Sequence, residues 1–180
     1  GEFTISGGHV CGYSVGNDGL DANGNCYVKG GVVYAIGSRS PEVAVDANSE
    51  GGYKLYVQGG TLVAIGGLES GATLSQNCYS SSSYSSNTWY SMTVGANTFA
   101  FKTPSNAGTP MVVSGSSTPT LKSGVSVSGG TSYFNGMWVE NATVSGGTSV
   151  TLTSYSGGNG GGPGGGGGGP GGGGGGPGGW

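Results

Sequence analysis

Apolar and polar residues alternate along short stretches of the chain, and a pair of glycines interrupts each stretch. The residues four and two positions before the first glycine are apolar or small, whereas the residues between them are mostly polar. This period of two is typical of β-strands that bury one face. The repeated stretches are residues 3–11, 26–34, 55–63, 125–133 and 142–150.

The first three stretches follow one another at spacings of 23 and 29 residues, and they align on both sides of the glycine pair. Val28 then matches Val57, and Val10 matches Val33 and Leu62. Such a repeat predicts a parallel β-solenoid, in which successive coils stack about 4.8 Å apart and like side chains form columns. The glycine pairs would form corners that need positive φ or leave no space for a Cβ. A β-sandwich with glycine hairpin turns is the alternative that we favour less for residues 3–67.

Residues 85–155 show a different pattern, with short apolar strands separated by prolines and glycines. A sheet or sandwich that caps the solenoid is the better prediction for this half. We therefore predict an all-β fold with three parts. Residues 1–80 form a short parallel β-helix, residues 81–156 form a β-rich cap, and residues 157–180 form an extended, polyproline-II-like tail. The tail has a proline every seventh residue, which excludes the period of three that collagen requires.

Composition narrows the classes of function. Charged residues make up only 7% of the chain, against roughly 25% in an ordinary soluble domain. Only five lysines and arginines are present, so we expect no nucleic-acid partner. No apolar run approaches the roughly 20 residues of a membrane span, so we expect no membrane insertion. The abundance of Ser, Thr, Tyr and Gly is more typical of extracellular proteins.

The three cysteines, Cys11, Cys26 and Cys78, are too few for a disulfide framework. Cys26 falls in an apolar column and is predicted to be a buried thiol. A bridge between Cys11 and Cys78, or one between two molecules, remains an alternative.

Two acidic segments, residues 17–24 and 42–50, carry most of the candidate chemistry. Asp21 and Asp46 are 25 residues apart, about one coil, and are predicted to point outward one above the other. Two carboxylates about 4.8 Å apart repel by roughly 1 kcal/mol even in bulk water, and a cation would relieve this. Asp18 and nearby Asn and Glu residues add oxygen ligands that suit Ca²⁺. The alternative is that these Asp and Asn side chains only cap turns.

Several of these motifs together resemble a known family. Thr-Ile-Ser-Gly-Gly at residues 4–8, Tyr-Val-Gln-Gly-Gly at residues 56–60 and Asn-Asp-Gly-Leu-Asp-Ala-Asn-Gly at residues 17–24 are similar to motifs of the carbohydrate-binding domain-containing β-helix proteins of anaerobic bacterial cell surfaces. That family is related in fold to pectate lyases. The resemblance covers roughly residues 1–155. It differs in length, because family members carry more coils upstream and only about three are present here.

The resemblance implies a right-handed parallel β-helix that binds Ca²⁺ through acidic side chains and binds polysaccharide without established catalysis. By this resemblance Asp18, Asp21 and Asp46 become candidate Ca²⁺ ligands. With few coils present, the first coil would also leave the N-terminal face of the stack, residues 3–14, open.

Aromatic side chains are the expected tool for binding sugars. Tyr27 and Tyr56 occupy the same outward position on successive coils and would form a ladder, which either binds glycan or stabilises the sheet. Tyr34 and Arg39 complete the candidate glycan-binding set. Arg39, the only arginine, could instead pair with Asp21 or Asp46, and the only histidine, His9, has no recognisable catalytic partners.

These observations favour a non-catalytic extracellular or bacterial cell-surface protein. We expect it to assemble head-to-tail with other copies of itself into a fibre and to present a glycan-binding face. A monomeric Ca²⁺-dependent carbohydrate-binding module is the alternative, and a pectate-lyase-like enzyme is favoured least.

Overall fold

The computed structural model describes residues 1–157, which form β-strands and one short 3-10 helix, η1 (Ser49–Gly51). The all-β prediction is therefore confirmed. Within this described part, no helix is long and apolar enough to cross a membrane. The predicted tail, beyond its first residue, lies outside the described residues.

Parallel pairing stacks the first part of the chain into three coils, which we number coil 1 (residues 3–20), coil 2 (residues 26–45) and coil 3 (residues 55–68). One side of the stack, the coil sheet, consists in order of β1 (Phe3–Ile5), β3 (Cys26–Val28), β5 (Leu55–Val57) and β7 (Thr73–Leu74). A second side consists of β2 (His9–Tyr13), β4 (Val32–Ile36) and β6 (Thr61–Ile65). Single bridges join Leu20, Val45 and Leu68 on the third side.

The register of the coils agrees with the sequence alignment. Val28 pairs in parallel with Val57, and Val33 pairs with both Val10 and Leu62. The structure explains why both positions of a pair are glycine. Gly31 adopts φ +80°, and a Cβ on the preceding Gly30 would lie 2.5 Å from the Ser6 carbonyl oxygen of the coil beside it. Only glycine allows the corners of neighbouring coils to approach so closely.

The sheets are not purely parallel, which corrects the prediction for the second side of the stack. Three later strands extend β6 as an antiparallel addition and give a mixed sheet, the shared sheet, of order β16-β8-β11-β6-β4-β2. The added strands are β8 (Cys78–Ser81), β11 (Met111–Ser114) and β16 (Thr153–Tyr155). We predicted the strand at residues 111–114 but placed it in the cap. Its apolar residues complete the exposed edge of β6 instead.

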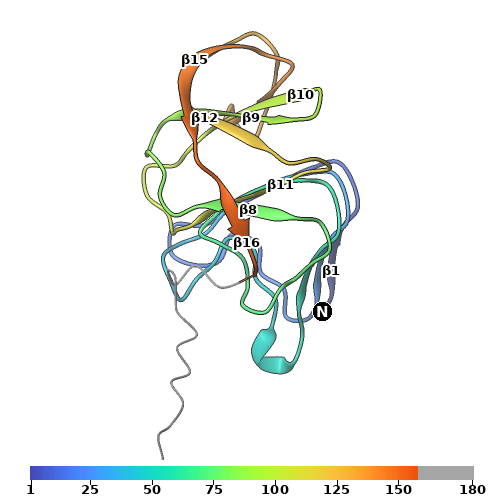
Figure 1. The fold of residues 1–180 in the computed structure, drawn as a ribbon. Helices are drawn as coiled ribbons and strands as arrows, with labels where there is room; N and C mark the ends of the chain where they lie inside the picture. Colours follow the sequence, from blue (N-terminus) through green and yellow to red (C-terminus); the bar gives the residue numbers. More distant parts are fainter. Residues whose placement is uncertain (158–180) are drawn as a thin grey trace, which may run out of the picture.

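The remaining strands form the cap sheet, which is entirely antiparallel and lies in the upper part of Figure 1. In order across the sheet they are β13 (Thr131–Tyr133), β14 (Trp138–Glu140), β10 (Asn97–Lys102), β9 (Trp89–Val94), β12 (Thr120–Ser128) and β15 (Thr143–Val150). We predicted a sheet or sandwich for residues 85–155; most strands of this range lie in the cap sheet, whereas β11 and β16 belong to the shared sheet.

Two hydrophobic cores separate three layers. The first core lies inside the coils and contains Cys26, Val28 and Leu55, all fully buried. The second lies between the shared sheet and the cap sheet and contains Trp138 and Phe101. The shared sheet is thus covered on both faces. All three cysteines are free thiols, so the alternative of a bridge between Cys11 and Cys78 is not realised.

Candidate functional site

The acidic residues form a ladder along the third side of the coils. Leu20, Val45 and Leu68 point into the first core, and the residue that follows each of them is acidic. The Asp46 amide donates to the Leu20 carbonyl at 2.7 Å, and the Glu69 amide donates to the Val45 carbonyl at 2.9 Å. Asp21, Asp46 and Glu69 therefore succeed one another on consecutive coils, as predicted for the first two.

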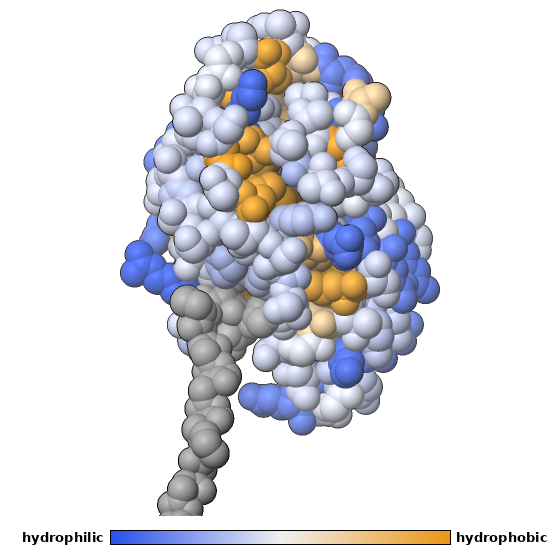
Figure 2. Space-filling model, in the orientation of Figure 1, coloured by the Kyte–Doolittle hydropathy of each residue, from blue (hydrophilic) through white to orange (hydrophobic). Residues whose placement is uncertain are grey.

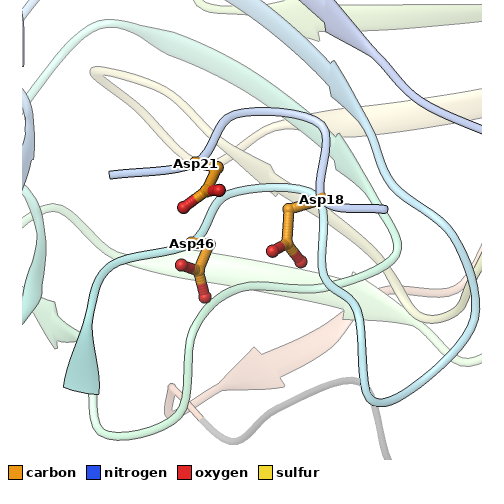
Figure 3. A group of neighbouring side chains, drawn as sticks. All are labelled: Asp18, Asp21 and Asp46. Carbon is orange, nitrogen blue, oxygen red and sulfur yellow. The ribbon is translucent and has the colours of Figure 1, made fainter. Parts of the chain in front are cut away.

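Asp18 brings a third aspartate to the same place from the turn before Leu20. Carboxylate oxygens of Asp18, Asp21 and Asp46 all lie within 4.8 Å of one another, and Figure 3 shows the three side chains converging. Asp18 Oδ1 also accepts a hydrogen bond from the Val43 amide at 2.6 Å. The structure thus brings together the three residues that we predicted as metal ligands. Hard oxygen ligands at this separation suit Ca²⁺.

Burial and crowding change the protonation of this cluster. Desolvation, followed by the hydrogen bond with Glu69 and the neighbouring negative charges, raises the pKa of Asp46 to about 9. Desolvation also raises the pKa of Asp18, although the Val43 amide opposes this shift. Without a cation, the ladder holds a proton at neutral pH because two adjacent carboxylates cannot both ionise without cost.

Glu69 belongs to this ladder, and the sequence analysis missed it. Its Oε1 accepts hydrogen bonds from Ser49 Oγ at 3.0 Å and from the Ser70 amide at 2.9 Å. Aligning Leu68 with Leu20 and Val45 would have revealed it, because each is an apolar residue followed by an acid. A groove of about 370 Å³ runs beside the ladder and is lined by Asp21, Asp46, Glu69, Glu50 and neighbouring small residues.

Asn48 caps a turn near the ladder, which is the role that the alternative prediction gave to the Asp and Asn side chains. Asn48 Oδ1 accepts from the Gly51 amide at 2.9 Å and so caps η1, while its Nδ2 donates to the Asn23 carbonyl at 3.3 Å. Asn48 therefore contributes to local structure, whereas the aspartates form the group that could hold a cation.

The predicted tyrosine ladder is present on the coil sheet. Tyr27 pairs in register with Tyr56, and their rings stack with centroids 4.8 Å apart and planes inclined by 8°. Lys29 Nζ lies 5.1 Å from the centroid of the Tyr27 ring. Each ring uses one face for the other, which leaves less aromatic surface for a sugar than two separate rings would offer.

The other two residues of the predicted glycan-binding set lie elsewhere, which corrects that set. Tyr34 is fully buried, and its hydroxyl donates to the Lys102 carbonyl at 2.7 Å. The cap sheet covers the face of β4 that an isolated solenoid would expose, so Tyr34 belongs to the second core. Arg39 donates to Asn106 Oδ1 at 3.4 Å and forms no ion pair with Asp21 or Asp46 in the described chain.

His9 ties coil 1 to the cap. Its Nε2 lies 2.9 Å from Glu140 Oε1, and its ring stacks on Tyr133 at a centroid distance of 3.8 Å. Trp138 Nε1 donates to the same Glu140 oxygen at 3.3 Å. The side chain of His9 therefore links two parts of the fold.

The chain was compared with protein-family models, curated proteins and solved structures, and none of them matches it. The comparisons therefore do not identify the β-helix family that its motifs resemble.

Proposed function

We propose that this chain is a non-catalytic structural module of the cell surface or extracellular space, in which coils 1 to 3 form a short right-handed parallel β-helix. Coil 1 is its docking end and associates with coil 1 of a second copy. The observation that carries this proposal is the unpaired outer edge of coil 1, where both β1 and β2 are terminal strands of their sheets.

Backbone groups along this edge point away from the molecule. Phe3 N donates to the Asn25 carbonyl at 3.0 Å, and the Ile5 carbonyl accepts from Lys29 N at 2.8 Å. Because bonding alternates along a parallel strand, the N–H and C=O of Thr4 face outward. Such an edge is a template for pairing with another chain.

Apolar side chains accompany the edge. Phe3, Tyr13 and Val15 are three of the four large hydrophobic residues exposed in the described chain, and Val15 is 78% exposed. Phe3 stands in the same inward column as Cys26 and is 36% exposed at the outer edge of coil 1. A second copy would cover this surface.

The two ends of the stack differ. Beyond coil 3, β11 pairs with β6, and the Tyr155 hydroxyl contacts both the amide and the carbonyl of Leu68, at 3.3 and 3.5 Å. At this end only the two-residue strand β7 is a terminal strand of the coil sheet, so the far end is largely covered. This difference favours a contact between two first coils over the head-to-tail fibre that we expected. This contact is isologous and closes after two copies.

Light scattering coupled to size-exclusion chromatography tests this proposal. The wild-type chain should form a dimer whose population rises with concentration, and the double variant Tyr13→Lys/Val15→Lys should be monomeric. Tyr53→Lys is the matched control, because Tyr53 is 44% exposed but lies outside coil 1. Thr4→Pro removes only an outward N–H and should also weaken the dimer. A wild-type chain that stays monomeric up to millimolar concentration would overturn the proposal.

Convergence of Asp18, Asp21 and Asp46 supports a second role for the coils, in which they bind Ca²⁺. The cation would neutralise the ladder and stabilise the stack.

Binding of polysaccharide is a further proposal, now confined to Tyr27 and Tyr56. A polysaccharide pull-down with wild type and a Tyr27→Ala/Tyr56→Ala variant, with and without chelator, tests it. Equal retention of both proteins would count against a glycan-binding role for the tyrosine ladder.

A further inference from the structure

A groove of about 340 Å³ lies on the face of the cap sheet that points away from the second core. Along β9, Tyr90 and Met92 face that core, so the alternate residues Ser91 and Thr93 face the groove. Five polar residues of β9, β10 and β12 line the groove, namely Ser91, Thr93, Thr98, Thr120 and Lys122. The rest of the lining consists of Ala142, Val144, Ser145 and Gly146, in or just before β15.

The strand register arranges the hydroxyl groups in rows. Thr93 pairs with Thr98 on one neighbouring strand and with Thr120 on the other, which gives three threonines side by side across three strands. Ser91 pairs with Lys122 in the next row. Adjacent strands are about 4.8 Å apart, so the hydroxyls form a regular array beside the ammonium group. Thr93 Oγ1 and Thr98 Oγ1 are 3.2 Å apart and share a hydrogen bond.

Glycines with positive φ lie in β12 and β15, near residues that line the groove. Gly124 and Gly147 lie between the paired residues of this ladder, where the register passes over both of them, and both have positive φ, +70° and +88°. A Cβ on Gly147 would lie 2.6 Å from Val125 Cγ1. The positive φ angles depart from ordinary strand geometry, and they occur in the same strand pair as Val144 and Ser145, which line the groove.

The chemistry of the lining is one-sided. Hydroxyls can donate hydrogen bonds and Lys122 carries a positive charge, whereas no carboxylate among residues 1–157 lines the groove. Lys122 is exposed and forms no ion pair within the described chain. Residues 81–156 contain two lysines and one acid, Glu140, whose Oε1 is already bonded to His9 and Trp138. Figure 2 shows a surface over the cap on which pale residues surround several hydrophobic patches, with few strongly hydrophilic residues.

The coils have the opposite charge balance. Residues 1–80 contain seven acids and three bases, a net charge of −4, whereas residues 81–156 carry a net charge of +1, which together give −3 for the chain. A negatively charged ligand is therefore drawn to the cap, where Lys122 is the uncompensated charge of the groove.

We propose that this groove binds an oxyanion, a sulfate or phosphate group that is either free or carried on a polymer. Lys122 supplies the charge. The row of Thr98, Thr93 and Thr120 supplies two free hydroxyl donors, because one of the Thr93 and Thr98 hydroxyls donates to the other. Hydrogen bonds to a charged partner are about twice as strong as neutral ones, so an array of weak donors suffices around one lysine. The site is independent of the end-to-end contact, because the groove residues belong to other strands.

Isothermal titration calorimetry of the whole chain at low ionic strength tests the proposal with sodium sulfate, sodium phosphate, dextran sulfate and neutral dextran. Lys122→Gln should weaken binding of the anionic probes at least tenfold. Lys102→Gln is the matched control, since Lys102 is also an exposed lysine of the cap sheet but does not line the groove. It should change the affinity less than twofold. Thr93→Val, which removes one hydroxyl, should weaken binding as well.

The probes also distinguish the two sources of the anion. Binding of both free sulfate and dextran sulfate points to the ion itself, whereas binding of dextran sulfate alone points to a polymer. Circular dichroism of each variant checks that it is folded. Equal binding of neutral dextran, equal affinity of Lys122→Gln and wild type, or no binding of any anionic probe would each overturn the proposal.

Discussion

Replacing Asp46 by Asn tests how the acidic ladder is neutralised. Asparagine keeps the size of the side chain and can still donate a hydrogen bond to Glu69, but it cannot ionise, so the cluster no longer has to hold a proton at this position to avoid charge repulsion. The carboxylate oxygens of Asp18, Asp21 and Asp46 lie within 4.8 Å of one another. At this distance two charges repel by about 1 kcal/mol in water and by about 3 kcal/mol at an effective dielectric constant near 20. Because the cluster is partly exposed, we expect a value near the lower figure.

The sign of the pH dependence follows from the pKa of Asp46. Its value rises from 3.8 to about 9 on folding, chiefly because of desolvation. The folded state therefore binds a proton more tightly than the unfolded state. The stabilisation is complete below about pH 4 and is lost as the pH rises through 9. The free energy of unfolding of the wild type should thus fall between pH 4 and pH 9.

Urea denaturation at several pH values in the presence of EDTA measures this effect. Asp46→Asn should be more stable than wild type by about 1 kcal/mol at pH 8. At pH 4 the two should be nearly equal. Glu2→Gln, which removes an exposed acid outside the ladder, is the control and should show the wild-type slope. The reasoning is refuted if Asp46→Asn loses stability equally at all pH values, or if wild type shows no slope.

If the acidic ladder binds Ca²⁺, the wild type should become more stable than Asp46→Asn when Ca²⁺ is added. A ligand that binds only the folded state at 100 times its Kd stabilises it by about 2.7 kcal/mol. Ca²⁺ at pH 8 should therefore raise the Tm of wild type and have little effect on Asp46→Asn. An unchanged Tm of wild type at millimolar Ca²⁺ would falsify the Ca²⁺ proposal and leave the shared proton as the means of neutralisation.

Three further predictions concern the coils. Leu55→Ala should lower the free energy of unfolding by about 2–5 kcal/mol in urea denaturation, because Leu55 is fully buried between coils; a loss below 1 kcal/mol would contradict this packing. Gly31→Ala should cost about 1–3 kcal/mol in the same assay, since Gly31 has φ +80° and a Cβ would lie 2.7 Å from the Gly7 carbonyl carbon. Burial raises the pKa of Cys26 to about 12 and also raises the pKa values of Cys11 and Cys78. A thiol reagent at pH 8 should therefore react only slowly with the folded chain, whereas all three thiols should react rapidly once the chain is unfolded.

The stacking of the coils could be derived from the sequence because its cause is local. Alternation with a period of two fixes which side chains face inward, and the glycine pairs mark the corners. Val28 and Val57 could be paired from these two signals alone, and with them the positions of Tyr27 above Tyr56 and of Asp21 above Asp46. The strands of the cap, such as β9, were also predicted from their apolar runs.

Which faces of those strands meet solvent was decided only by tertiary structure. Tyr34 reads as an outward residue of a coil, yet the cap sheet covers it, and β11 joins the shared sheet across a long separation in sequence. The position of Glu69 beside Asp46 was likewise not predicted, because the spacing from Val45 to Leu68 differs from the spacing between Leu20 and Val45. Alternation along a strand records that two faces differ, but contacts between distant segments determine what packs on each face.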